Sequence, residues 1–291
     1  MRNNILRLLA IAALILVTNS ALLAQRLVSI YGTAQVAGRD AVVHIWVVLP
    51  PGADANQTAL EALRSQGARP FLPGEFSTTG LVWDQFFDGS SGNDFVTQYY
   101  NPNGDPTNGA GQIALSNTHR TWTSVADSKF EFDPGGTTTR CPSLVRECPG
   151  PQSYDGFNDV AWLPLSGCCT LGVTWYSTSI DEADMALNTK FPWATNGENY
   201  DVETVYLHEN GHVAGLGHSD IEEAVMYAYY SGLRRVLDPD DIAGIIHLYP
   251  RNEEPPDGGS CPFGQPGDLC DANSECCSGK CTGKPGAKTC K

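Results

Sequence analysis

The sequence predicts an α+β fold followed by a small disulfide-rich C-terminal module. Short runs rich in β-branched and aromatic residues recur between residues 41 and 188 and are broken by Gly, Asn and Asp. Several other stretches have the capping residues and apolar spacing of helices. Six of the ten cysteines fall in the last 31 residues, a share typical of a disulfide scaffold.

The composition bounds the class of protein. The 291 residues suffice for one substantial domain and a small one. A formal charge of −15 argues against nucleic acid and anionic lipid as partners, and solubility alone explains the acidity. The cysteines form clusters of four and six, and even counts favour an oxidising compartment.

Residues 1–24 have the pattern of a secretory signal. Arg2 and Arg7 precede an unbroken apolar run from Leu8 to Val17, and Ala24 is a suitable last residue before cleavage. A membrane anchor is the alternative, but this run is too short to span a bilayer comfortably. We therefore expect a secreted, extracellular protein that does not span the membrane after the signal is removed.

Residues 25–75 form a separate β-then-α segment. A strand-like run extends from Ala41 to Pro50, and Asp54 can cap a helix that continues to Arg64. The segment is either a pro-segment or an N-terminal packing domain. His44 is expected to be a strand residue with no catalytic task.

Residues 76–251 form the main domain. The pattern predicts strands at 81–87, 95–101, 129–135, 171–177 and 183–188, and helices at 112–125, at 202–214 with Asp201 as cap, and from 239 with Asp238 as cap. His119 and His247 are interpreted as ordinary helix residues. Two disulfides are expected among four cysteines, without a bond between the adjacent pair, which would be strained: Cys141, Cys148, Cys168 and Cys169.

The stretch HENGHVAGLGHSD, from His208, carries the clearest chemistry. His208 and His212 leave the same face of a helix, where two neutral imidazoles can bind one Zn²⁺. Gly215 allows the helix to end, so that His218 can return as a third ligand. Glu209 is placed to reach a water beside the metal without being a ligand. Three protein ligands leave a fourth position open, as in catalytic zinc sites.

These residues resemble the matrixin branch of the metzincin metallopeptidases. The zinc stretch matches the family motif, with Ser219 after the third histidine, and AVMYAYY resembles the Met-turn that places Met226 beneath the zinc. LDPDDIAGIIHLYP, from Leu237, resembles the final matrixin helix, and weaker matches begin near residue 80. The resemblance implies a zincin-like domain, with a twisted mixed β-sheet, long helices, an active-site helix and the Met-turn.

The resemblance also implies an activity, the hydrolysis of internal bonds in protein or peptide substrates. One zinc would activate a water, with Glu209 as general base. The substrate would lie extended along an edge strand, for which residues 171–177 are the candidate. The segment between Tyr227 and Leu237 would shape the main specificity pocket, with three tyrosines as its candidate lining: Tyr227, Tyr229 and Tyr230.

The chain departs from the family pattern in four places. No histidine occurs between His119 and His208, and Ala186 stands where a ligand of a second, structural zinc would be, so that zinc is not expected. Ala228 replaces the usual proline of the Met-turn, and no cysteine before residue 141 could cover the catalytic zinc. Calcium is an alternative to plain solvation for a set of acidic and amide side chains: Asp155, Asn158, Asp159, Asp181, Asp184 and Asn188.

Beyond an acidic linker at 252–260, residues 261–291 have the cysteine spacing C-x₈-C-x₅-CC-x₃-C-x₈-C, which resembles the inhibitor cystine knot. That resemblance implies three pairs: Cys261 with Cys277, Cys270 with Cys281, and Cys276 with Cys290. Such a tail could bind a surface, a glycan or the substrate, through a basic patch formed by Lys280, Lys284, Lys288 and Lys291. It could equally be a protease-resistant appendage. The alternative function for the whole chain is a secreted binding protein, in which the tail is functional and the protease-like domain is a scaffold.

Overall fold

The computed structural model describes residues 27–70, 82–87, 94–178, 181–230 and 232–251, and the backbone of 281–284 and 287–290. The signal, the linker and most of the cysteine-rich module therefore lie outside the described residues, as do the three predicted knot pairings. Of the module, a short antiparallel hairpin is described, formed by β11 (Cys281–Lys284) and β12 (Ala287–Cys290).

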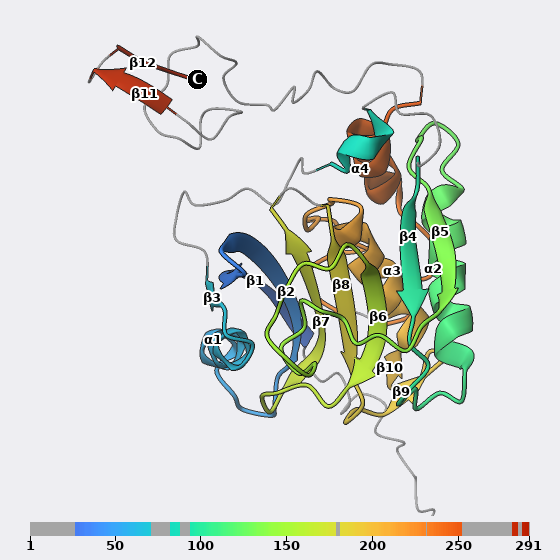
Figure 1. Ribbon diagram of the computed structural model, residues 1–291. Helices are drawn as coiled ribbons and strands as arrows, with labels where there is room; N and C mark the ends of the chain where they lie inside the picture. Colours follow the sequence, from blue (N-terminus) through green and yellow to red (C-terminus); the bar gives the residue numbers. More distant parts are fainter. Residues whose placement is uncertain are drawn as a thin grey trace, which may run out of the picture.

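An eight-stranded mixed sheet runs through the molecule in the order β3-β1-β2-β7-β8-β6-β4-β5 (Figure 1). Its strands are β1 (Leu27–Val36), β2 (Arg39–Val48), β3 (Arg69–Pro70), β4 (Val96–Tyr100), β5 (Phe132–Thr137), β6 (Asn158–Leu163), β7 (Thr170–Ser177) and β8 (Ala183–Asn188). Strands β5, β4, β6 and β8 are parallel, whereas β7, β2 and β1 each pair antiparallel with their neighbour. A second, two-stranded sheet joins β9 (Trp193–Ala194) to β10 (Tyr200–Asp201).

Four α-helices are described, and each of three begins at a predicted aspartate cap. They are α1 (Ala55–Ser65), α2 (Ala110–Thr123), α3 (Val202–Val213) and α4 (Pro239–Leu248). The carboxylates of Asp54, Asp201 and Asp238 accept backbone N–H groups at the starts of α1, α3 and α4. Helices α2 and α3 lie together behind the sheet in Figure 1, and α1 lies beside β1 and β3.

The two faces of the sheet bury separate cores. On β2, Val42, Trp46 and Val48 belong to the core that includes α2, α3 and α4, while Val43, Ile45 and Val47 belong to the core beneath α1. Successive side chains of a strand point to opposite faces, so this division follows directly from the strand periodicity. The N-terminal hairpin is thus buried on both faces.

The α+β class is confirmed, as are most of the predicted elements, but the structure differs from the prediction in two places. Residues 81–87 were predicted as a strand, whereas a 3₁₀ turn occupies Asp84–Phe86. The N–H of Trp83 donates to the Tyr249 hydroxyl and its indole N–H to the Val213 carbonyl, so this segment uses its donors outside the sheet. The strand β1 was not predicted.

The four cysteines of the main domain form two disulfides, as expected, but their pairing corrects the prediction. Cys141 bonds to Cys148 across a seven-residue separation, and the adjacent Cys168 and Cys169 bond to each other. Once the first bond closes its own short loop, the adjacent cysteines are left as partners.

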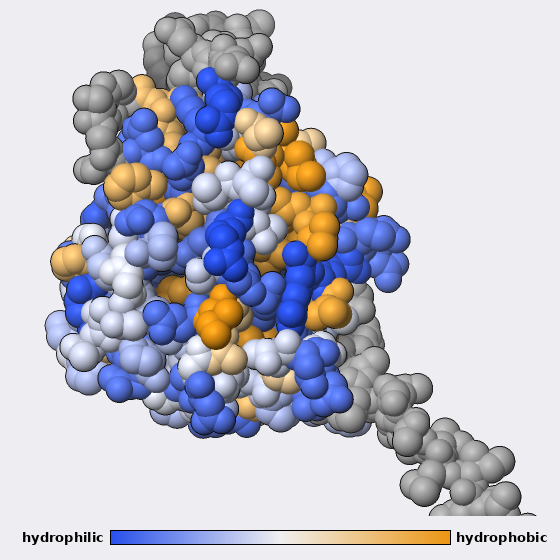
Figure 2. Space-filling view, turned by 90° about the vertical axis from the view of Figure 1, so that its right-hand side faces the viewer, coloured by the Kyte–Doolittle hydropathy of each residue, from blue (hydrophilic) through white to orange (hydrophobic). Residues whose placement is uncertain are grey.

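The side of the molecule that carries α2 and β5 is largely hydrophilic, with hydrophobic side chains gathered in limited areas (Figure 2). This agrees with the net acidic composition. In the described part of the chain, no helix has the length and apolar content needed to cross a membrane.

Candidate metal centre

Helix α3 presents His208 and His212 one turn apart, with their Nε2 atoms 2.9 Å from each other. Each Nδ1–H donates to a carbonyl, that of Val225 at 2.7 Å and that of Leu216 at 2.8 Å. These bonds select the tautomer that leaves both Nε2 lone pairs free, a common second-shell arrangement for metal-binding histidines. Burial holds the pKa of both imidazoles well below the usual range, so both are neutral.

The turn after α3 brings His218 back to the same place. Gly215 has φ +95°, which only glycine adopts readily, and the Leu216 N–H donates to the Gly211 carbonyl at 2.9 Å. The ring of His218 lies 5.0 Å from that of His212 and 5.4 Å from that of His208, measured between centroids. The structure thus brings together the three histidines singled out in the sequence.

The Met-turn packs directly against the helix. A Cβ atom at Gly211 would lie 2.2 Å from the sulfur of Met226, so this contact requires the glycine of HENGH. The carboxylate of Asp241, on α4, accepts the N–H groups of Val225 and Met226 at 2.8 and 3.0 Å. The final helix therefore fixes the turn beneath the histidines, although Ala228 replaces proline there.

Glu209 lies beside the histidines and is fully buried. Burial raises the pKa of its carboxyl to about 7, against the opposing effects of His208 and of a hydrogen bond from the Thr174 hydroxyl on β7. Its Oε2 also lies 3.0 Å from Nδ1 of His44, and its buried Oε1 has no protein partner. A carboxyl with this pKa can accept and return a proton near neutral pH.

His44 is a strand residue, as expected, and its side chain lies beside the three histidines. One ligand atom each from His44, His208, His212 and His218 lies within 4.8 Å of the others. Among the described residues this is the one cluster of at least three His, Cys, Asp or Glu side chains that could hold a metal ion. The donor set fits zinc, which accepts neutral imidazole nitrogens.

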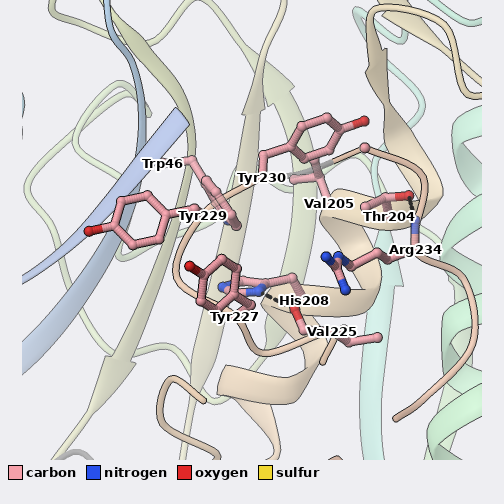
Figure 3. A pocket seen from close by; sticks show the side chains of 10 residues that line it. Trp46, Thr204, Val205, His208, Val225, Tyr227, Tyr229, Tyr230 and Arg234 are labelled. Carbon is pink, nitrogen blue, oxygen red and sulfur yellow. Dashed lines mark hydrogen bonds between the residues drawn. The ribbon is translucent and has the colours of Figure 1, made fainter. Parts of the chain in front are cut away.

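A pocket opens next to His208, and the three predicted tyrosines line it: Tyr227, Tyr229 and Tyr230. Trp46 of β2 lies among these tyrosines, as Figure 3 shows, with its ring centroid 4.6 Å from that of His208. Val205 and Val225 add apolar lining. Thr204 and Arg234 add polar lining, so the pocket is mixed in character.

Residues 84–250 match the family model for matrixin. The chain belongs to the matrixin family. This match covers more than half of the chain and contains α3, the Met-turn and α4, but not the N-terminal hairpin β1–β2. The fold and the histidine cluster are those expected of a zinc metalloendopeptidase.

Individual relatives agree with this assignment. The chain is 50% identical over 100 residues to metalloendoproteinase 2-MMP of Arabidopsis thaliana, covering 31% of this chain and 26% of the relative. It is 29% identical over 143 residues to metalloendoproteinase 1 of Glycine max, covering 47% and 44%. Karilysin of Tannerella forsythia is 46% identical over 57 residues, covering 20% and 12%. The matches span less than half the length of each of these relatives.

The side chains considered for calcium use many of their oxygens within the matrixin domain. Asp159 pairs with the Arg140 guanidinium through two bonds of 2.8 Å, and buried Asp184 accepts the N–H groups of Leu144 and Asp159. The Asn158 carbonyl oxygen accepts the Ala183 N–H. A calcium ion there would have to replace or share these contacts.

The other candidates also have partners within the protein. Asp155 accepts the N–H of Phe157, Asp181 pairs with Arg39 in an exposed ion pair, and Asn188 donates to the Thr170 carbonyl. Ala186 is buried in the core beneath α1, where it has no ligand atom to offer.

Four residues around the cluster were not anticipated from the sequence: Ser29, Tyr31, Trp46 and Thr174. Three of them lie on the hairpin. The sequence pattern that could have indicated them is the alternation of polar or aromatic with aliphatic residues in 27–36 and 41–48. That alternation predicts which residues share a face, but not which element the face contacts.

Proposed function

We propose that this chain is a secreted zinc endopeptidase that hydrolyses internal bonds of protein substrates. His208, His212 and His218 would hold the zinc, and Glu209 would act as general base. The observation that carries this proposal is the convergence of three neutral imidazoles next to one buried carboxyl, within a domain of the matrixin family.

Zinc bound there would supply a Lewis acid that polarises the scissile carbonyl and acidifies water. Glu209 takes a proton from the attacking water and later passes it to the leaving amine. Its pKa of about 7 suits both steps near neutral pH. Met226 supports the ligand histidines from below through its contact with Gly211, and it is not itself a ligand.

The substrate would lie extended along β7 and place one side chain in the pocket lined by Tyr227, Tyr229 and Tyr230. In the structure β2 occupies that edge of β7, so an extended peptide has to take its place.

Secretion is proposed from the signal pattern of residues 1–24 and from the disulfides of the main domain. The cysteine-rich tail is proposed as an accessory module of the cystine-knot kind that could bind a surface, a glycan or the substrate. A scaffold role for the matrixin domain is disfavoured, because a scaffold has no need of a buried glutamate with a pKa near 7 beside a metal cluster.

Casein hydrolysis and zinc content together test the proposal. In a form of the chain that cleaves casein, we expect a zinc chelator to abolish hydrolysis. In the same form, Glu209→Gln should keep one zinc per chain while hydrolysis falls by about 10²- to 10⁴-fold. Full activity of Glu209→Gln would disprove the role of the base. Failure of every zinc-loaded form of the chain to cleave casein would disprove the function.

A further inference from the structure

The N-terminal hairpin lies along the strand that a substrate would use. Strand β2 pairs antiparallel with β7 over seven residue pairs, from Ala41 opposite Ser177 to Val47 opposite Thr170. His44 stands opposite Thr174, whose hydroxyl donates to Glu209. The hairpin lies outside the matrixin match, so a segment in addition to the family domain holds this position.

One face of this hairpin is directed at the histidine cluster. His44 and Trp46 alternate with aliphatic residues on β2, and their cross-strand partners on β1 are Tyr31 and Ser29. The Tyr31 hydroxyl lies 2.9 Å from Nδ1 of His212. Ser29 Oγ lies 3.1 Å from the Nε2 atom of His218 and donates to the Ala228 carbonyl at 3.1 Å. Four neighbouring positions on one face of the hairpin, two on each strand, therefore contact the site.

His44 has the features of a metal ligand. Its side chain is fully buried, and its ring lies 4.1 Å from that of His212 and 5.2 Å from that of His218. Nδ1 donates to Glu209 Oε2 at 3.0 Å, while Nε2 is buried with no hydrogen-bond partner among the described residues. A buried ring nitrogen left unpaired is costly, and a metal ion shared with the neighbouring histidines would satisfy it. A carboxylate on the other ring nitrogen is a common second-shell partner of a zinc-bound histidine.

The same hairpin also engages the base and the pocket. The hydrogen bond from His44 uses Glu209 Oε2, the oxygen that Thr174 also contacts. Trp46, two residues along the same face, is almost completely buried and lines the pocket beside His208. One short stretch of β2 thus contacts the histidine cluster and Glu209 through His44 and the pocket through Trp46.

We propose that the hairpin β1–β2 is a built-in inhibitor of this endopeptidase, in which His44 is the fourth zinc ligand and Trp46 fills the substrate pocket. The proposal rests on the function proposed above. Zinc with four protein ligands has no open position, so the chain is latent while the hairpin is in place. Activity requires the hairpin to leave β7.

Access of a small ligand to the metal tests this inference without relying on activity. The full chain would be loaded with Co²⁺ in place of zinc and titrated with acetohydroxamate, with the visible absorption of the metal as readout. We expect His44→Gln to bind acetohydroxamate at least tenfold more tightly than the wild type, because the competing imidazole is tethered close to the metal. The matched control is His119→Gln, which makes the same change at another buried histidine, on α2 and outside the cluster. It should behave as the wild type.

The outcomes separate the two proposals. If the wild type binds no Co²⁺ or Zn²⁺, the endopeptidase proposal fails. If the wild type binds metal and takes up acetohydroxamate as tightly as His44→Gln, the inhibitor proposal is overturned while the endopeptidase proposal stands. Should His44→Gln fail to fold, His44→Ala replaces it. The visible spectrum of the Co²⁺-loaded wild type also decides between the alternatives. Four nitrogen ligands without water support the inference, whereas three nitrogen ligands with an exchangeable water contradict it.

Discussion

The active-site helix α3 and the N-terminal hairpin β1–β2 contribute histidines to the same cluster in different ways. The histidines of α3 and its following turn lie within 11 residues, and their spacing alone predicts that they meet. His44 is 165 residues from Glu209 in sequence, and only the pairing of β2 with β7 brings them together. Local geometry thus brings three histidines together, and long-range strand pairing adds His44 to them.

The largest expected difference between the two regions is in zinc affinity. His212→Ala removes a ligand from the rigid helix, and we expect the zinc dissociation constant to rise by more than the 10- to 100-fold typical of losing a second-shell partner. His44→Ala leaves three ligands in place and should cost less. Competition with a chromophoric chelator measures both values. Equal losses for the two variants would mean that the hairpin is as much a part of the metal site as the helix.

A buried histidine outside the cluster shows what burial alone does. Burial lowers the pKa of His119 to about 4, below its value of about 6.5 in an unfolded chain. The unfolded state therefore takes up a proton first, and stability contributed by the neutral ring is lost as the pH falls from about 6.5 to about 4. Relative to His119→Gln, the wild type should lose up to about 3 kcal/mol of unfolding free energy over that range.

Denaturant unfolding at several pH values, with saturating zinc in both proteins, measures this difference. The comparison with His119→Gln removes the contributions of all other titrating groups. If the unfolding free energies of the two proteins change with pH in parallel, His119 is not the cause of the loss of stability at low pH.

The contact beneath the helix should be sensitive to a single methyl group. In Gly211→Ala the new Cβ would meet the sulfur of Met226 at 2.2 Å and Trp122 Cζ2 at 3.0 Å. We expect a loss of about 1–3 kcal/mol of unfolding free energy from overpacking. The variant Met226→Ala makes room, so the double variant should be more stable than the sum of the single losses predicts. If the losses of unfolding free energy in the two single variants simply add in the double variant, the two residues have no steric interaction.

The smallest effect is expected in the helix that backs the hairpin. The Asp54 carboxylate accepts the Gln57 N–H at 2.8 Å, and Asp54→Ala should cost about 1 kcal/mol of stability. Glu61→Ala, on the same helix, removes only an exposed bond from Gln57 and should stay within about 0.5 kcal/mol of the wild type. If thermal unfolding ranks the two the other way, the cap does not hold α1 in place.

The sequence was sufficient for features that depend on neighbours along the chain. The caps at Asp54, Asp201 and Asp238 and the turn at Gly215 are local, and each was predicted before the structure. The association of residues 84–250 with the matrixin family also follows from short motifs.

The features that were missed depend on distant partners. Nothing local in HIW, from His44, indicates that its polar face contacts residues beyond 170. The stretch 81–87 has the composition of a strand, but Tyr249 and Val213 take the hydrogen-bond donors of Trp83. The bond between Cys168 and Cys169 depended on where Cys148 would lie, which the sequence leaves open.

X-ray absorption at the zinc edge of the full-length wild-type chain tests the central claim most directly. The fine structure counts the imidazoles bound to the metal in the protein as it exists, with no variant needed. The hairpin and α3 together predict four imidazole nitrogens at ~2.0–2.1 Å and no water oxygen. Three imidazoles and one water oxygen in the full chain would contradict the claim that the hairpin closes the site.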